Sequence, residues 1–196
     1  MANQGRFFPV QSIHFGVVTS PRTMNAAVLP MDIAQGAGST SGFGLGGQLG
    51  MMIEWQGGVY RLIQFDNGSA VAAIDGGVLY WKTMSTFEAT SDASTGEAAA
   101  NGICGGTHVV LTDRYYGFVQ CGGDQAAVVV AASAVAGDHL TGHATTDNVL
   151  TRTAAGTAPI DKLAATALTT RGTTTSDVGA SVSNSSKVRW VLGNLI

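Results

Sequence analysis

Apolar and polar side chains alternate with a period of two in short runs along most of the chain. Such alternation is typical of β-strands with one buried face. Residues 59–65 (VYRLIQF) show it clearly, with Tyr60 and Leu62 on one face and Arg61 and Ile63 on the other. β-Branched and aromatic residues predict further strands in the same way. The additional predicted strands are residues 69–74, 78–82, 107–112, 116–120, 125–131, 148–154, 163–169 and 187–192.

The last of these strands has the clearest division between two faces. Val188, Trp190 and Leu192 share one face, and Lys187 and Arg189 share the other.

Glycine and polar clusters separate the predicted strands. The DNG sequence at 66–68 is a tight-turn signal, because Asn-Gly tolerates the positive φ angles of hairpin turns. We predict that DRYY (113–116) and CGGD (121–124) are turns, and that the Ser/Thr/Ala-rich residues 85–102 form a polar excursion. The sequences AAIDG and LAATALTT are too short or too rich in threonine to favour a helix.

The first part of the chain has a different amino-acid composition. Residues 1–50 contain Pro9, Pro21 and Pro30, and residues 36–50 include seven glycines in fifteen positions. Ordering such a segment costs much conformational entropy, so we expect it to become ordered only against a partner surface. The predicted fold is therefore an all-β, compact antiparallel β-sandwich or barrel-like domain (51–196) with an extended Gly-rich N-terminal arm (1–50).

Charged residues make up 12% of the chain, about half the usual share of a soluble domain, and the net charge is −3. The ten basic residues are scattered singly, so we expect no nucleic-acid partner. We also expect no membrane insertion, because the uncharged residues 33–53 are rich in glycine, serine and glutamine. Two interpretations of this weakly charged surface remain open: a large neutral Ser/Thr surface, or a surface covered by other subunits.

Cys104, His108, Cys121, His139 and His143 are the residue types that zinc accepts. Their spacing argues against a zinc site, because structural zinc sites favour closely spaced Cys pairs and His pairs. The alternatives are a disulfide between the cysteines, or two small apolar residues near the ends of a hairpin formed by 107–112 and 115–120. We favour the hairpin and expect both thiols to be reduced, since the start of the chain has no apolar core of a signal peptide.

Other catalytic and cofactor patterns are weak. The sequence GSTSG (38–42) has threonine where a nucleophile elbow has serine, and GFGLGG (42–47) lacks the flanking strand and helix of a dinucleotide site. The carboxylates are dispersed, although a calcium ion on a surface loop stays open. These carboxylates are Glu54, Asp66, Asp75, Glu88, Asp92 and Glu97. We therefore assign no catalytic, cofactor-binding or metal-binding residues and expect the chain not to be an enzyme.

The aromatic residues are expected to form the core and a seam between subunits, with a glycan-binding platform as the alternative. They are Trp55, Tyr60, Tyr80, Trp81, Tyr115, Tyr116, Phe118 and Trp190.

Several stretches from about residue 49 onward resemble capsid decoration, or cement, proteins of tailed bacteriophages. In that family a G-x-x-YR-hydrophobic strand precedes a small-residue segment, and a Y-G-x-V-Q-x-G-G strand and an A-G-D-x-L turn follow. The matching stretches are LGMMIEWQGGVYRLIQFDNGSAVAAIDGGVLYW, GI at 102–103, YYGFVQCGGDQAAVVV, AVAGDHL, AAGTAPI and KVRWVLGNL.

The resemblance implies a virion structural protein, made in the host bacterial cytoplasm, that binds the outer surface of the icosahedral head. Its expected partners are the major capsid protein and further copies of itself, as a trimer or dimer. It brings no catalytic residues and no cofactor. The alternative function is a receptor- or glycan-binding module of a tail or fibre.

Overall fold

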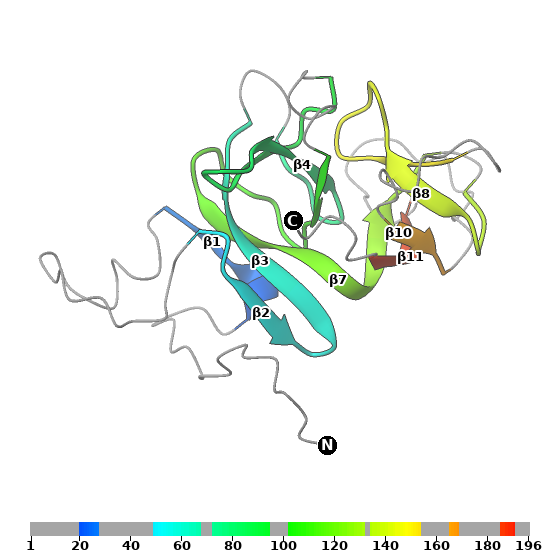
Figure 1. The fold of residues 1–196 in the computed structure, drawn as a ribbon, viewed down its shortest axis with the longest axis horizontal. Coiled ribbons are helices and arrows are strands. Elements are labelled where there is room, and N and C mark those ends of the chain that lie inside the picture. The colour runs from blue at the N-terminus through cyan, green and yellow to red at the C-terminus, as the bar shows by residue number, and fades with distance from the viewer. Residues whose placement is uncertain are drawn as a thin grey trace, which may run out of the picture.

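A computed structural model describes residues 20–27, 49–67, 72–94, 102–131, 134–153, 165–168 and 185–190. Strands dominate these residues, which confirms the all-β prediction (Figure 1). The elements are η1 (Pro21–Thr23), β1 (Asn25–Ala26), β2 (Met52–Trp55), β3 (Gly58–Phe65), β4 (Val78–Thr83), β5 (Glu88–Thr90), β6 (Ile103–Gly106), β7 (Tyr116–Val129), β8 (His139–Gly142), β9 (Leu150–Arg152), β10 (Ala165–Ala167) and β11 (Ser185–Trp190). No helix in this part of the chain is long and apolar enough to cross a membrane.

Five strands close into a first barrel. The order is β3-β5-β4-β6-β7, and β7 returns to pair with β3. All of these pairings are antiparallel except β3 with β5, which run parallel. Every strand contributes to one apolar core, together with two loop residues. The buried core residues are Ile63, Phe65, Ala73, Leu79, Trp81, Ala89, Cys104, Leu111 and Val119.

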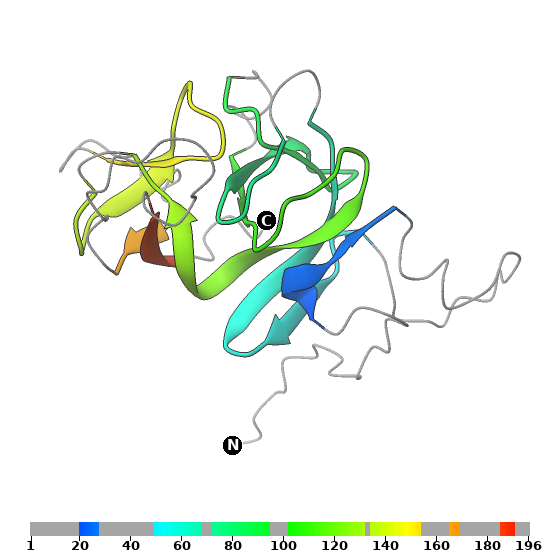
Figure 2. The same cartoon turned by 180° about the vertical axis from the view of Figure 1, so that it is seen from behind.

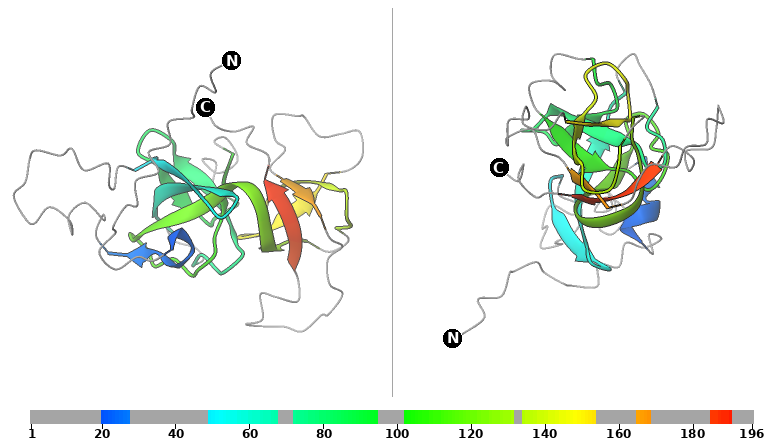
Figure 3. Two further views of the ribbon diagram at one scale, coloured as in Figure 1. Left: turned by 90° about the horizontal axis from the view of Figure 1, so that it is seen from below. Right: turned by 90° about the vertical axis from the view of Figure 1, so that its right-hand side faces the viewer.

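The second half of β7 starts another ring of strands, in the order β7-β11-β10-β8-β9. A parallel bridge between Val130 and Leu150 closes this ring, and the Ala131 amide donates to the Leu150 carbonyl at 2.7 Å. The two rings therefore share β7, and they lie side by side along the long axis of the molecule (Figures 1 and 3).

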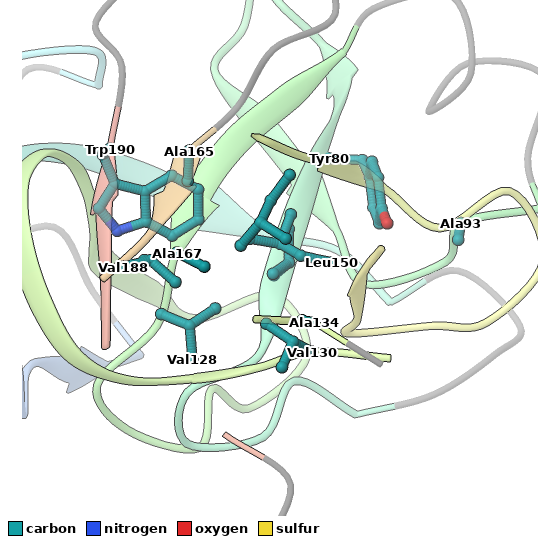
Figure 4. Packing of buried hydrophobic residues seen from close by; sticks show 12 residues of the cluster. Tyr80, Ala93, Val128, Val130, Ala134, Leu150, Ala165, Ala167, Val188 and Trp190 are labelled. Atoms are coloured by element: carbon teal, nitrogen blue, oxygen red, sulfur yellow. The ribbon is translucent and has the colours of Figure 1, made fainter. Parts of the chain in front are cut away.

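Strand β4 forms the wall between the two cores. Leu79 and Trp81 point into the first barrel, whereas Val78 and Tyr80 point into the second core. Figure 4 shows Tyr80 at one end of that second core and Trp190 at the other. Because both faces of β4 are covered, its apolar residues run continuously instead of alternating with polar ones.

The predicted turn at CGGD (121–124) is wrong, because β7 continues through it as a single strand. The chain bends there with a register shift against β3, and from Gly123 onward β7 pairs with β11. The buried Gln120 amide donates to the carbonyls of Gly122 (2.9 Å) and Asp124 (3.0 Å), and Gly123 adopts a φ of +77°. The glycines that indicated a turn thus serve a bend inside a long strand.

Residues 107–112 are not a strand either, so the predicted hairpin with 115–120 does not form. β6 lies just before them and pairs with β7 at Gly106 and Gln120. Side-chain and loop partners bind the backbone at the two ends of this segment instead. For example, the Thr107 amide donates to the Gly77 carbonyl (2.9 Å), and the Thr112 amide donates to the Asn25 side chain (3.0 Å).

Two further predictions of local structure are corrected by the sheet order. The polar excursion at 85–102 contains β5, a short strand that the first barrel needs for closure. Asp66 and Asn67 of the DNG sequence do not start a tight hairpin, since β5 lies between β3 and β4. The tight hairpin is instead at Gln56 and Gly57, where both residues have positive φ angles of 47° and 76°. Of the predicted strand 69–74, the described residues 72–74 are not in a strand.

Part of the predicted arm belongs to the folded body. β1 pairs with β7 through Asn25–Gly117 and Ala26–Tyr116, and Figure 2 shows it beside the β2–β3 hairpin. Met24 is 1% exposed and packs with Tyr60, Leu62 and Phe118 on the outer face of the first barrel. The glycine-rich residues 36–48 of the arm, and its residues 1–19, lie outside the described residues.

Replacing Gly123 with alanine is expected to destabilise the fold at the bend of β7. A Cβ atom there would lie 2.2 Å from the Gly57 carbonyl oxygen, which is backbone and cannot move aside cheaply. Gly57→Ala is the matched control, because Gly57 has a similar φ but no atom near the position of a Cβ. Urea unfolding should show that Gly123→Ala costs about 1–3 kcal/mol more than Gly57→Ala. Equal costs would show that the close approach at the bend does not matter.

Candidate functional site

The two cysteines lie in the wall of the first barrel as free thiols. Cys104 of β6 is buried, and Cys121 of β7 is partly buried, with its thiol donating to the Val59 carbonyl at 3.5 Å. Burial and then the neighbouring Cys121 thiol raise the pKa of Cys104, and burial raises the pKa of Cys121 to about 11. Both thiols are therefore protonated at neutral pH, which suits core packing better than nucleophilic or metal chemistry.

The three histidines proposed as possible zinc ligands do not join the cysteines. His139 is exposed on β8, and the Nδ1 atom of His143 accepts from the amides of Thr145 (3.2 Å) and Thr146 (3.0 Å). Within the described ranges no group of three or more His, Cys, Asp or Glu side chains lies together as a metal site would need.

The carboxylates considered as possible calcium ligands also lie in separate places. Asp66 is 2% exposed and lies 2.8 Å from the Lys82 amine and 3.0 Å from an Arg114 nitrogen. The Asp92 carboxylate accepts from the amide and hydroxyl of Ser94. Glu54 and Asp75 are exposed, Glu88 is half-buried, and Glu97 lies outside the described residues. Asp66 therefore forms ion pairs in the core, and Asp92 makes local hydrogen bonds.

Most of the aromatic residues form the core, as expected. Trp55, Tyr115 and Tyr116 are half-buried. The buried members of the set are Tyr60, Tyr80, Trp81, Phe118 and Trp190. The eight aromatics do not form an exposed platform, so the geometry gives the glycan-binding alternative no specific support.

A cluster that the sequence analysis missed fixes the 20–27 segment to the first barrel. The Arg22 Nε atom donates to the Tyr60 hydroxyl at 2.7 Å. The Arg22 guanidinium lies 5.2 Å from the Trp55 ring centroid and 5.9 Å from that of Tyr60, within cation–π range. The His108 ring also lies near Tyr60, at a centroid distance of 5.8 Å. No sequence pattern around Arg22 indicates that it fixes this segment to the first barrel.

His108 extends this cluster to the bend of β7. Its Nε2 atom lies 2.7 Å from Gln120 Oε1. Since the Gln120 amide nitrogen already donates to two carbonyls, its oxygen must accept, and His108 Nε2 carries the proton. Burial lowers the pKa of His108, partly opposed by the Gln120 hydrogen bond. A neutral imidazole therefore supports the bend.

A second buried glutamine joins the first barrel to the second ring of strands. The Gln125 amide donates to the Thr107 carbonyl at 2.7 Å, and its oxygen accepts from the Trp190 indole at 2.9 Å. The outer face of the same junction carries an ion-pair group, in which Arg189 and Lys187 of β11 contact Asp124 of β7. The Arg189 hydrogen bonds lower the pKa of Asp124.

Arg61 is another buried residue that the sequence analysis did not single out. Its side chain points into the first barrel, where it is 8% exposed, and its guanidinium lies 5.5 Å from the Trp81 ring centroid. One nitrogen donates to the Met52 sulfur at 3.3 Å, whereas Nε has no hydrogen-bond partner. The sequence held a usable signal here, since the strand alternation placed an arginine on the same face as Ile63.

Compared with known proteins, the chain matches no family model and no curated protein sequence.

The fold should lose stability as the pH falls from 7.5 to 5.5. Because the pKa of His108 is lower in the folded protein than its ordinary value of 6.5, the unfolded chain binds the proton more readily. Stability is therefore full above about pH 6.5 and declines as the pH falls toward the folded-state pKa. The measurement is the urea midpoint at several pH values.

The control for this pH dependence is His108→Gln, which keeps a donor for Gln120 but does not titrate near neutral pH. Its midpoint should change less over the same range, in which ordinary carboxylates stay ionised. The same slope in both proteins would assign the pH dependence to other groups.

Proposed function

We propose that this protein is a capsid decoration protein of a tailed bacteriophage, which binds the outside of the head and stabilises it by bridging major capsid subunits. Its work is adhesion by many copies on a symmetric lattice, so that modest contacts add up by multivalency. The proposed location is the virion, and the proposed partners are the major capsid protein and further copies of the chain.

The observation that carries this proposal is the continuity of β7 through both barrels. A body that bridges neighbouring subunits must transmit load without a hinge between its parts. Here one strand belongs to both hydrogen-bonded rings, and Gln125, Trp190 and the Asp124 ion pairs fasten the junction. Such a body suits a static bridging role.

The chemistry of the described side chains agrees with adhesion. The buried Gln120 and Gln125 side chains make hydrogen bonds that hold strands together, and the thiols are protonated. Low charge also favours a surface that is covered in the assembled particle. The resemblance to decoration proteins along residues 49–196 points to the same role.

Purified protein is expected to bind expanded heads that lack it, prepared from the phage that encodes this chain. Co-sedimentation should saturate at a fixed number of copies per head, because binding sites on an icosahedral lattice are equivalent. Heads with bound protein should also resist heating better than bare heads, since a ligand of the intact shell stabilises it. Failure to bind, or location of the protein on the tail by electron microscopy, would contradict the proposal.

A chain that begins at Ser20 tests the predicted role of the first residues of the arm. It retains the segment that packs on the first barrel through Met24 and Arg22. We expect an unchanged urea midpoint but weaker binding to heads. Unchanged head binding would show that residues 1–19 do not contribute to it.

A further inference from the structure

In the described part of the chain, strand β2 is an open edge of the sheet, beside the first barrel. It pairs with β3 on one side and ends the strand order of the sheet. Its residues are Met52, Ile53, Glu54 and Trp55, of which only Glu54 is exposed. An edge strand with apolar residues and unpaired backbone groups is a template for another strand.

The backbone groups that face this open edge belong to Met52 and Glu54. The Leu62 amide donates to the Met51 carbonyl at 2.9 Å, so Met51 directs its carbonyl toward β3. Along an antiparallel strand the direction alternates, and Ile53 and Trp55 therefore also face β3. The amides and carbonyls of Met52 and Glu54 point outward and are available to a further strand.

Arg61 lies beside this edge with its positive charge uncompensated. It is directly opposite Met52 in the β2–β3 register, and its guanidinium contacts the Met52 sulfur. Among the described residues it makes no ion pair, although it is 92% buried (8% exposed) and its Nε atom lacks a hydrogen-bond partner. A buried charge without an ion pair is costly, so this position favours an acidic group from outside.

Glu54 of a second copy meets this requirement. Met52, Glu54 and Arg61 lie on the same face of the sheet, because Met52 pairs with Arg61 and side chains two residues apart share a face. The residue of the second copy that lies opposite Met52 is two strands away from Arg61. Its backbone is therefore about 10 Å from the backbone of Arg61. A glutamate and an arginine side chain together span that distance over Met52.

The backbone and the charges select one register. Hydrogen bonding between outward-facing groups allows only Met52 opposite Met52, Met52 opposite Glu54, or Glu54 opposite Glu54. The last register places two carboxylates together, and the first leaves Glu54 away from Arg61. The register with Met52 opposite Glu54 makes two hydrogen-bonded pairs and brings each Glu54 to the Arg61 of the other copy.

We propose that two copies of this chain pair through β2 as antiparallel strands, with Ile53 of each on the two-fold axis and Glu54 of each ion-paired with Arg61 of the other. The interface is isologous, as a two-fold dimer requires. It goes beyond the proposed head binding and is measured without heads, so either can fail while the other holds.

Cross-linking of the full chain tests the register. With Ile53 on the axis, its two Cα atoms lie about 4.5 Å apart in a non-hydrogen-bonded pair, within reach of a disulfide. Ile53→Cys should therefore form a covalent dimer under mild oxidation. Glu54→Cys should not, because its two Cα atoms lie more than about 8 Å apart. The unmodified chain controls for Cys104 and Cys121, and circular dichroism checks that each variant folds.

Sedimentation equilibrium tests the ion pair without any cysteine. Glu54→Gln should weaken the dimer by at least about tenfold, because it leaves both Arg61 groups unpaired. Asp75→Asn, which removes the same charge from an exposed position in another part of the fold, should leave the dimer unchanged. Glu54→Pro should abolish it, since it also removes an outward-facing amide but none of the β2–β3 bonds.

A monomer at all concentrations would overturn the proposal. Cross-linking of Glu54→Cys in place of Ile53→Cys, or equal effects of Glu54→Gln and Asp75→Asn on the dimer, would overturn it as well.

Discussion

The rest of the structure depends on the bend of β7, where one strand leaves the first barrel and enters the second. A strand can bend this sharply only if its backbone groups keep hydrogen-bond partners. The Gln120 side chain supplies two of them, at the carbonyls of Gly122 and Asp124, and His108 holds the glutamine in place. Gly123 gives the bend its positive φ and its close approach to the Gly57 carbonyl. Beyond this bend, the second half of β7 pairs with β11 and contributes Val128 to the core that covers the other face of β4.

Buried polar groups play two different roles in this molecule. Gln120, Gln125 and the Asp66 ion pairs are satisfied inside the fold, and such groups specify one arrangement of strands. Arg61 differs, because its charge meets only a sulfur atom and an aromatic ring in the described part of the chain. A buried charge without an ion pair among the described residues distinguishes the β2 edge as an interface.

The proposed adhesive role depends less on the chemistry of individual side chains than on the rigidity of the folded body. Two small barrels would move relative to each other if a loop joined them, but a shared strand and the shared wall β4 prevent this. The weak surface charge and an open edge strand then make contacts with other subunits favourable. The proposed decoration of a shell would use both features.

The sequence by itself determined the all-β class, the two faces of β3 and β11, and most of the aromatic core, because these follow from side-chain alternation within single strands. It could not show that Cys104, His108 and His143 lie in different surroundings, since their spacing alone leaves the pairing of strands open. Only the tertiary structure decided that CGGD is a bend, that 85–102 contains a barrel strand, and that 107–112 is a loop. Each of these depends on partners distant in sequence: Gln120 is fixed by His108, β5 lies against β3, and Thr112 contacts Asn25. Local patterns report which residues prefer extended backbone, whereas the choice of hydrogen-bond partners is made by the whole fold.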